Sequence, residues 1–374
     1  MNPKLVALQP SMIRELNAKK KPTSIDLGLG EPTLLPDPAP LRAALAWVEQ
    51  NGCPYSPNPG LQPLREAVAR YHAYPGLTDA SQVGITVGSQ EALSVALAAL
   101  ADPEHDEVLV IEPAYPLYTK LCGLFGVRWR SVALSADDGF TPRADVVLAA
   151  LGDATRIIVL ASPVNPTGRT WSVGELEKLG KGLAARKGPP VYIVSDEVYR
   201  ELYFGAEAPV SPAVYWPHTI VVGSLSKSCA LTGLRIGWFL APKAEAPELH
   251  KAHQFLVSST NTYGQVAAIE IFKQPQIITA HRQSYLDKLR VITGALDRAG
   301  LSYVKPDGAF YVFVKLRGAL ANDSLSFALK LLETHDTLVI PGLAFGAEGY
   351  ARLSFVGADD KLEEGVRRMA AFST

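Results

Sequence analysis

The sequence predicts an α/β fold: a mostly parallel sheet between helices, together with a smaller α+β domain. At 374 residues the chain is longer than single hydrophobic cores usually grow, which favours two domains. Between residues 83 and 240, short runs rich in Val and Ile alternate with helical segments, as in sheets buried on both faces. After about residue 275 this alternation gives way to a long helix followed by strands. The predicted boundaries are 1–40 for an N-terminal arm and part of the small domain, 41–275 for the large domain and 276–374 for the small C-terminal domain.

The N-terminal segment shows few signals of regular structure. Its opening 25 residues are polar and are expected to be irregular, with Lys19-Lys20-Lys21 solvated. A proline-rich loop follows Gly28-Leu29-Gly30. Helices are then predicted at 41–50 and at 64–71, the second one started by Pro63.

The central part of the chain supplies the strands of the large sheet. Short apolar runs predict strands at 85–87, 108–111, 157–160, 191–194, 220–222 and 236–240. An alanine-rich helix over 89–101 follows the first strand. No long helix separates the last two strands, so we expect that pair to run antiparallel.

The C-terminal part has the mixed pattern of an α+β domain. A long helix is predicted over 276–299 and a closing helix over 361–372. Between them, strands are predicted at 302–304, 310–314, 338–340 and 351–355.

Composition excludes several functional classes. A formal net charge of −1 argues against nucleic acid as the main partner, because binding a phosphate backbone needs a basic surface. We find no signal-peptide core at the N-terminus and no apolar run of membrane-spanning length. The three cysteines lack CxxC spacing, which indicates a cytoplasmic protein without a disulfide or metal framework. His250 and His253, spaced i, i+3, are interpreted as a solvated helix face rather than a metal site.

The segment Ser224-Leu225-Ser226-Lys227 carries the strongest chemical signal. Lys227 follows an apolar strand, and a lysine held desolvated at a strand end favours its neutral, nucleophilic amine. Arg235 and the neighbouring serine hydroxyls could hold an anion such as a phosphate. These parts suit an aldehyde cofactor that is bound covalently at one end and by its phosphate at the other.

Other polar groups also lie where predicted strands end, which is where open parallel sheets bind ligands. Gly88-Ser89-Gln90 forms a tight turn into a helix and offers free N–H groups to an anion. Asn165 lies in a turn fixed by two prolines. Asp196 ends a buried strand and needs a cation, either a protonated pyridine nitrogen or a structural arginine.

Two further residues follow the same logic. Tyr115 comes after a predicted strand and offers an aromatic face, either for stacking on a planar ring or for core packing. Arg352 lies inside an apolar strand and must face a carboxylate, either internal or brought by a substrate.

Together these motifs resemble those of the class I and II aminotransferases, the fold type I pyridoxal-phosphate enzymes related to aspartate aminotransferase. The resemblance extends from Gly28 to about Phe372. It rests on Asn165-Pro166-Thr167-Gly168, Asp196-Glu197-Val198-Tyr199, the Lys227 segment with Arg235 eight residues later, and Arg352-Leu353-Ser354-Phe355. It implies a seven-stranded type of large sheet.

The resemblance assigns roles around pyridoxal 5′-phosphate. It implies that Lys227 forms the Schiff base (aldimine) with the cofactor and moves a proton between substrate Cα and cofactor. Asp196 would keep the pyridine nitrogen protonated, and Tyr115 would stack on the ring. Asn165 and Tyr199 would hydrogen-bond the ring's phenolic oxygen. The phosphate would be bound by Ser89, Gln90, Ser224, Ser226 and Arg235.

It also implies the substrates and the assembly. Arg352 would clamp the substrate α-carboxylate, helped by Asn165 and by the backbone around Gly30. Tyr55 resembles the tyrosine that reaches the phosphate of the neighbouring subunit, which implies a homodimer with shared active sites. The expected reaction is ping-pong transfer of an amino group from an L-amino acid to a 2-oxo acid.

Three rival functions were weighed, one of them on the same scaffold. A pyridoxal-phosphate-dependent C–S lyase, acting by β-elimination, would share the cofactor-binding residues. A transcription regulator with an aminotransferase-like domain would need a DNA-binding module, and only about 27 residues precede Gly28. A nicotinamide-dependent dehydrogenase is disfavoured because Gly28-x-Gly30 lacks a third glycine and a strand–turn–helix context.

Overall fold

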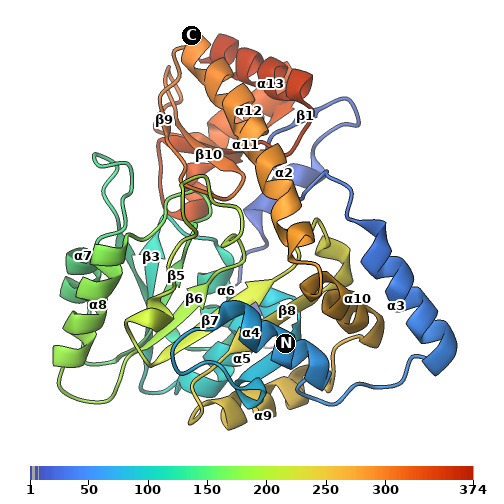
Figure 1. The fold of residues 1–374 in the computed structure, drawn as a ribbon. Coiled ribbons are helices and arrows are strands. Elements are labelled where there is room, and N and C mark those ends of the chain that lie inside the picture. Colours follow the sequence, from blue (N-terminus) through green and yellow to red (C-terminus); the bar gives the residue numbers. More distant parts are fainter. Residues whose placement is uncertain (2–4, 7, 374) are drawn as a thin grey trace.

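A seven-stranded sheet forms the centre of the molecule (Figure 1). The computed structural model describes residues 1, 5–6 and 8–373. In sheet order the strands are β2 (Val83–Val87), β8 (Ile236–Leu240), β7 (Thr219–Ser224), β6 (Tyr192–Asp196), β5 (Thr155–Ala161), β3 (Glu107–Glu112) and β4 (Arg128–Ala133). Only β8 runs antiparallel to its neighbours in this sheet, which confirms the mostly parallel sheet and the antiparallel last pair.

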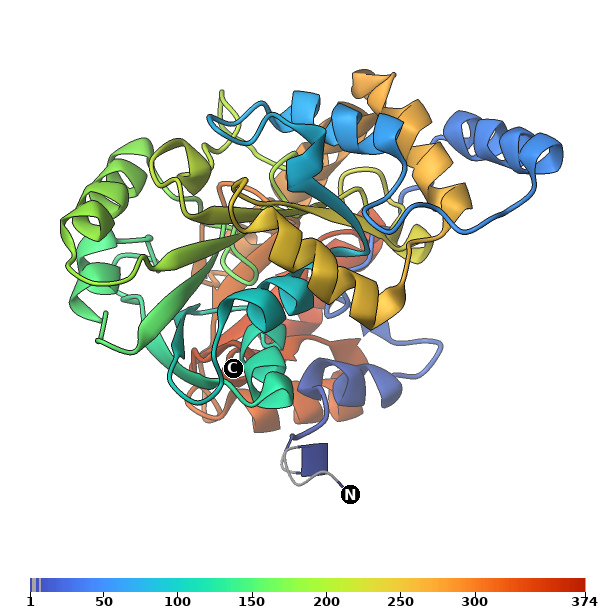
Figure 2. The same ribbon diagram turned by 90° about the horizontal axis from the view of Figure 1, so that it is seen from below.

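Helices cover both faces of this sheet. On one face, α5 (Ser89–Leu100), α6 (Leu117–Phe125) and α9 (Ala246–Val257) pack on strand residues such as Val110, Val194 and Phe239. The other face is covered by α4 (Gln62–His72), α7 (Ala144–Ala149) and α8 (Val173–Ala185). Figure 2 shows α4 on the opposite side of the sheet from α5 and α9. Because both faces are buried, the strands are continuous apolar runs, as the sequence indicated.

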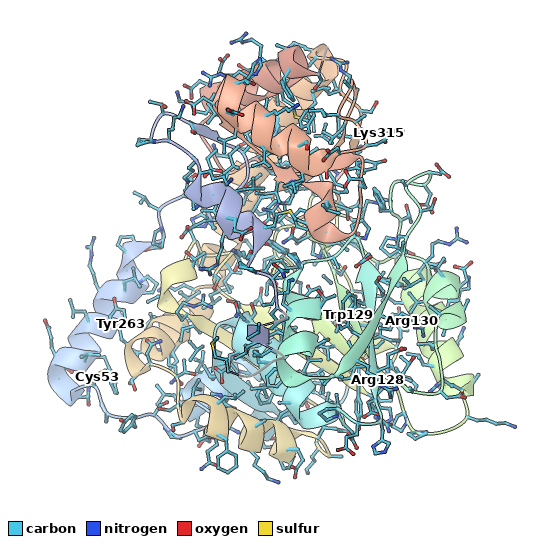
Figure 3. All side chains as sticks on the ribbon, turned by 180° about the vertical axis from the view of Figure 1, so that it is seen from behind. Cys53, Arg128, Trp129, Arg130, Tyr263 and Lys315 are labelled. Carbon is cyan, nitrogen blue, oxygen red and sulfur yellow. The ribbon has the colours of Figure 1, made fainter. Side chains whose placement is uncertain are left out.

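Two helices extend to one side of the molecule. α3 (Pro38–Asn51) packs against α10 (Thr262–Phe272), and the Tyr263 hydroxyl donates to the Leu41 carbonyl over 3.1 Å. Figure 3 shows Tyr263 and Cys53 on this side. The predicted helices at 41–50 and 64–71 are confirmed as α3 and α4, each with a proline in its first turn.

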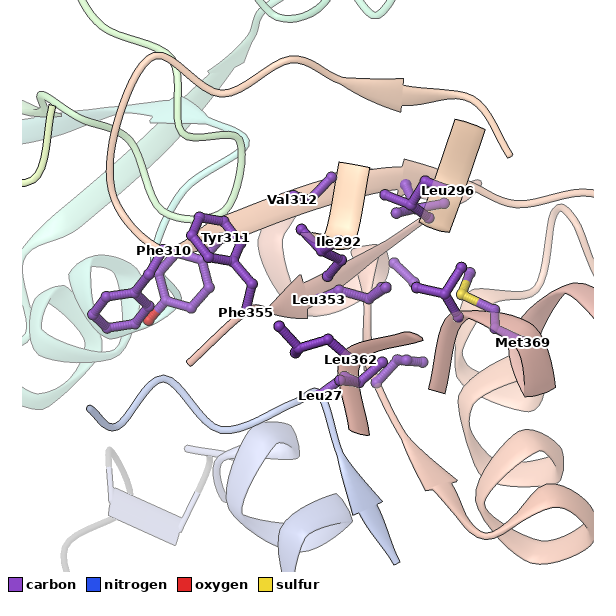
Figure 4. Packing of buried hydrophobic residues seen from close by; sticks show 14 of the residues in the cluster. Leu27, Ile292, Leu296, Phe310, Tyr311, Val312, Leu353, Phe355, Leu362 and Met369 are labelled. Atoms are coloured by element: carbon purple, nitrogen blue, oxygen red, sulfur yellow. The ribbon is translucent and has the colours of Figure 1, made fainter. Parts of the chain in front are cut away.

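The smaller α+β part carries a second sheet, of order β12-β13-β10-β9. Its strands are β9 (Tyr303–Val304), β10 (Tyr311–Lys315), β12 (Ile340–Pro341) and β13 (Tyr350–Ser354). The accompanying helices are α11 (Pro275–Arg298), α12 (Ser324–His335) and α13 (Asp359–Phe372). Ile292 and Leu296 of α11 pack there with Leu353 and with Leu27 from the N-terminal segment (Figure 4). A short parallel pair, β1 (Ile25–Asp26) with β11 (Thr337–Leu338), also joins this segment to the C-terminal part.

Three expectations about secondary structure need correction. The opening segment is not irregular throughout, because α2 (Met12–Ala18) forms there and buries Leu16. Within the run Lys19-Lys20-Lys21, Lys20 is not simply solvated but pairs with Asp26 over 2.6 Å. The run 338–340 is not one strand, since β11 and β12 belong to different sheets.

The edge strand β4 was not predicted because its Arg128, Trp129 and Arg130 are exposed (Figure 3), as is common on sheet edges.

Candidate active site

Lys227 lies just beyond the carboxyl end of β7, where it meets the N-terminal loop. Its ammonium Nζ donates to the Gly30 carbonyl over 2.8 Å. Burial, assisted by the positive charge of Arg352, lowers the pKa of Lys227 to about 8. This shift makes the neutral amine, the form that acts as a nucleophile or a base, far more accessible near neutral pH than it is in an ordinary lysine.

Asp196 ends the neighbouring strand β6 and is 5% exposed. Its Oδ2 accepts from the Tyr118 hydroxyl over 2.8 Å, and its Oδ1 accepts from the Val198 amide over 3.3 Å. Burial raises the pKa of Asp196, while the hydrogen bond from Tyr118 acts in the opposite direction. Tyr118 is a site residue that the sequence analysis missed, although it lies one helical turn after Tyr115.

Arg352, on β13, is 2% exposed and faces the same region. Its Nη1 donates to Asn165 Oδ1 over 2.9 Å, and its Nη2 donates to the Gly28 carbonyl over 2.5 Å. The guanidinium carbon lies 4.2 Å from the ring centre of Tyr311 and 4.9 Å from that of Phe345. Its buried Nε has no hydrogen-bond partner within the described part of the chain. A buried guanidinium with an unused donor is suited to a carboxylate ligand.

Tyr199 is brought close to this arginine through a second tyrosine. The hydroxyls of Tyr199 and Tyr311 lie 2.8 Å apart, and burial raises the pKa of both. A Cβ at Gly30 would lie 1.9 Å from the Tyr311 hydroxyl, so only glycine lets the N-terminal loop approach so closely. The sequence alone does not single out Tyr311, because a tyrosine inside an apolar strand is indistinguishable from core packing.

The residues predicted to hold a phosphate converge at the start of α5. Gly88, with φ 75°, precedes this helix, whose first turn has no side-chain cap. Arg235 lies against the turn, and its Nη2 is 3.4 Å from the Val87 carbonyl. A Cβ at Gly88 would lie 2.2 Å from that nitrogen, so glycine is required for the guanidinium to reach this position. Free amides beside an arginine make an anion site.

The other predicted phosphate ligands surround this turn. Ser224 Oγ donates to the Ile236 carbonyl over 2.7 Å and accepts from the Ser226 amide over 3.0 Å. Ser226 Oγ lies 2.8 Å from Ser224 Oγ. Ser89 and Gln90 occupy the first turn of α5, where Ser89 is half-buried and Gln90 is exposed.

The two remaining predicted residues differ in environment. Tyr115 is half-buried and packs edge-on against Tyr118, with ring centres 5.9 Å apart. Tyr55 is 93% exposed, so within a single chain it is not part of the buried cluster.

The interpretation of His250 and His253 as a solvated helix face is wrong for His253. This side chain is fully buried, because it points from α9 toward α5, where its Nδ1 lies 2.6 Å from Glu91 Oε1. Among the described residues, no group of three His, Cys, Asp or Glu side chains could hold a metal ion. In the same part of the chain, no helix is both long and apolar enough to cross a membrane.

Comparison with known proteins places this geometry in a family. Residues 22–369 match the family model described as aminotransferase class I and II. The chain is 33% identical to the probable N-acetyl-LL-diaminopimelate aminotransferase of Bacillus subtilis, over 100% of this chain and 95% of that protein. It is 30% identical to an aspartate aminotransferase of Pyrococcus horikoshii, over 98% and 95% of the two chains. The solved structure of aspartate aminotransferase from Thermus thermophilus with maleate superposes with a TM-score of 0.92 at 29% identity, covering 100% of this chain and 99% of that one.

Proposed function

Because this chain belongs to the class I and II aminotransferases, we propose that it transfers the amino group of an L-amino acid to a 2-oxo acid by a ping-pong reaction, with pyridoxal 5′-phosphate as its cofactor. The family typically uses this cofactor. One observation carries the proposal. The half-buried amine of Lys227, with its pKa lowered to about 8, lies at the strand ends among an anion site, a buried carboxylate and a buried arginine.

The residues present fit the cofactor. The uncapped start of α5 and Arg235 suit a phosphate dianion, with Ser89, Gln90, Ser224 and Ser226 around them. Within the described part of the chain, Asp196 has a single side-chain donor, Tyr118, and so keeps acceptor capacity for the N–H of a pyridinium. The unpartnered Nε of Arg352 suits the α-carboxylate of a substrate, with Asn165 and Gly30 beside it.

When bound, the cofactor would act as an electron sink that stabilises negative charge on the substrate α-carbon. Lys227 would hold the aldehyde end and, once released, its Nζ would take the proton from the substrate α-carbon as a general base. Asp196 would hold the proton on the pyridine nitrogen, oriented by the Tyr118 hydroxyl. Asn165 and Tyr199 would donate to the phenolic oxygen, and Tyr115 would cover the ring face.

The substrates of the relatives do not select the amino acid. The names of two relatives differ, one specifying N-acetyl-LL-diaminopimelate and the other aspartate. The Arg352 clamp recognises only the α-carboxylate that all amino acids share. The proposal therefore extends to an L-amino acid and a 2-oxo acid as classes.

We further propose a homodimer in which Tyr55 reaches the phosphate of the other subunit. Tyr55 is 93% exposed on the loop that precedes α4, so its side chain is accessible to a second subunit. The exposed free thiol of Cys53 supports a reducing, cytoplasmic location.

The test is a spectroscopic screen of the purified holoenzyme with a panel of L-amino acids, followed by addition of 2-oxo acids. A donor should convert the cofactor absorbance to the pyridoxamine form, and a 2-oxo acid should reverse it. Lys227→Ala should abolish both changes, by a factor of at least about a hundred, whereas Lys243→Ala, at an exposed lysine, should leave them intact. If no amino acid shifts the spectrum, or if cystathionine yields pyruvate and ammonia without amino transfer, the proposal fails.

A further inference from the structure

A buried histidine–carboxylate pair lies behind the predicted phosphate turn. His253 is fully buried, with Nδ1 2.6 Å from Glu91 Oε1 and Nε2 2.9 Å from the Asn58 carbonyl. Both ring nitrogens thus face acceptors. Each contact needs one proton to be a hydrogen bond: one between Nδ1 and the Glu91 carboxylate, and one on Nε2 for the Asn58 carbonyl. The two side chains are 0% and 9% exposed, so a lost bond would not be replaced readily by water.

Glu91 connects this pair to the phosphate turn. Its Oε2 accepts from the Val87 amide over 2.5 Å. The Val87 carbonyl lies 3.4 Å from Arg235 Nη2. Val87 directly precedes Gly88-Ser89-Gln90, so the carboxylate and the guanidinium together fix both peptide groups of the residue from which the turn starts. Glu91 itself lies in the first turn of α5, next to the amides that would face the phosphate.

Asn58 connects the pair to the loop that carries Tyr55. Asn58 Nδ2 donates to the Ser258 carbonyl over 2.7 Å, which fastens the loop to the end of α9. The next residue, Pro59, accepts from the Ile85 amide of β2 over 2.9 Å. A single imidazole thus holds α9, the start of α5 and the Tyr55 loop together.

We propose that His253 and Glu91 are positioning residues for the cofactor phosphate: the pair holds the turn at 88–90 and the Tyr55 loop in a fixed relation to each other. This inference rests on the proposed function, since it presumes that pyridoxal 5′-phosphate binds at the start of α5. Neither side chain needs to touch the phosphate. Their contribution is to keep its ligands in place when the site fills and empties.

Two substitutions of Glu91 distinguish a positioning role through hydrogen bonds from an effect of its negative charge. In Glu91→Gln, the amide oxygen can accept from Val87 and the amide NH₂ can donate to His253 Nδ1. A neutral His253 then still donates from Nε2 to Asn58, so every contact survives. In Glu91→Ala, the Val87 amide and His253 Nδ1 both lose their partner. A positioning role therefore predicts that Gln rescues binding where Ala does not.

The experiment compares the affinities of the apoenzyme for pyridoxal 5′-phosphate and for pyridoxal, which lacks the phosphate, by equilibrium dialysis. The ratio of the two affinities isolates the contribution of the phosphate. His253→Phe and Glu91→Ala should lower this ratio about tenfold or more, because buried partners are left unpaired. His253→Gln, which can reach only one of the two acceptors, should give a smaller loss. Glu91→Gln should stay close to the wild-type ratio.

His250→Gln provides the matched control. His250 lies one turn earlier on α9, is half-buried, and contacts a backbone carbonyl, that of Ser81, over 2.9 Å. Its substitution should leave the ratio unchanged. Only folded protein binds either compound, so the ratio does not depend on the folded fraction, and His253→Gln serves if His253→Phe fails to fold.

Two results would overturn the inference: an unchanged ratio in Glu91→Ala and the His253 variants, or a loss in Glu91→Gln equal to that in Glu91→Ala. A wild-type protein that does not bind pyridoxal 5′-phosphate at all would instead contradict the proposed function. The two failures are therefore distinguishable.

Discussion

Asp196 and Glu197 are consecutive buried carboxylates whose surroundings differ completely. Side chains alternate along an extended chain, so Asp196, the last residue of β6, and Glu197, the residue after it, point to opposite faces of the sheet. Glu197 accepts from three hydroxyls: Tyr74 at 2.6 Å, Ser211 at 2.5 Å and Ser195 at 3.0 Å. Asp196 accepts from one hydroxyl, that of Tyr118, at 2.8 Å. Burial raises the pKa of both carboxyl groups.

The difference distinguishes a structural carboxylate from one with capacity left for a ligand. Glu197 has its acceptor sites supplied by the protein, as buried polar groups in stable cores usually do. Asp196 is equally buried, yet within the described residues it accepts only from the Tyr118 hydroxyl and the Val198 amide, which leaves acceptor capacity for a ligand. An incompletely satisfied buried group is expected where a ligand completes the set. The contrast yields three predictions, in decreasing order of effect.

The largest effect should separate the isosteric substitutions Asp196→Asn and Glu197→Gln. Asn cannot hold a positive pyridine nitrogen, so kcat/KM should fall about a hundredfold or more, whereas Glu197→Gln should retain most of the activity. The effect of Asp196→Asn on stability should not parallel its effect on activity. The folded-state pKa of Asp196 is raised above its unfolded value, so ionising Asp196 costs stability as pH rises through that window. The apo form of Asp196→Asn should therefore be at least as stable as wild type at neutral pH.

Steady-state kinetics and urea unfolding of the apo forms measure the two quantities. If Glu197→Gln loses as much activity as Asp196→Asn, both carboxylates serve the site and the distinction is wrong. A marked loss of stability in Asp196→Asn would equally contradict it.

The intermediate effect concerns Glu197, whose acceptor sites are occupied by hydroxyl groups of the protein. Tyr74→Phe removes the hydroxyl that donates to Glu197 Oε2 and should lower the free energy of unfolding by about 1–3 kcal/mol. Ser211→Ala should cost less, because Ser195 still donates to Oε1. Neither change should alter kcat/KM of the holoenzyme. Urea titration gives the stabilities, and a kinetic defect without a stability loss would show that this cluster serves the active site instead.

The sequence was sufficient for the parts of the fold with strong periodic patterns. Continuous Val- and Ile-rich runs predicted six of the strands in the large sheet, because both sheet faces are buried. The edge strand β4 has exposed, charged side chains, and α2 has only Leu16 fully buried, so neither produces such a pattern. The division of 338–340 between two sheets depends on tertiary pairing that local patterns do not contain. The domain boundaries at 40 and 275 remain predictions.

For the site, chemistry at strand ends was readable, but contacts between distant segments were not. Lys227, Asp196 and Arg352 stand out in sequence because a charged residue inside or after an apolar run needs a partner. Tyr118 and Tyr311 do not stand out, since a buried tyrosine serves a core equally well. His253 lies 162 residues from Glu91, and nothing in its own helix indicates that partner.

The smallest effect should come from the one hydroxyl that Asp196 does have. Tyr118→Phe removes the hydrogen bond that opposes the rise in the pKa of Asp196, so this pKa should rise further. The carboxylate must be ionised to hold a pyridinium, so the acid limb of the kcat/KM profile should move to higher pH. We expect a loss of several-fold on the acid side and convergence with wild type as pH increases. Tyr303→Phe, which removes a hydroxyl bonded over 3.1 Å to the exposed Asp297, should leave the profile in place. A loss that is equal at all pH values would mean that Tyr118 acts by packing alone. Burial, and not the Tyr118 hydroxyl, would then set the pKa of Asp196.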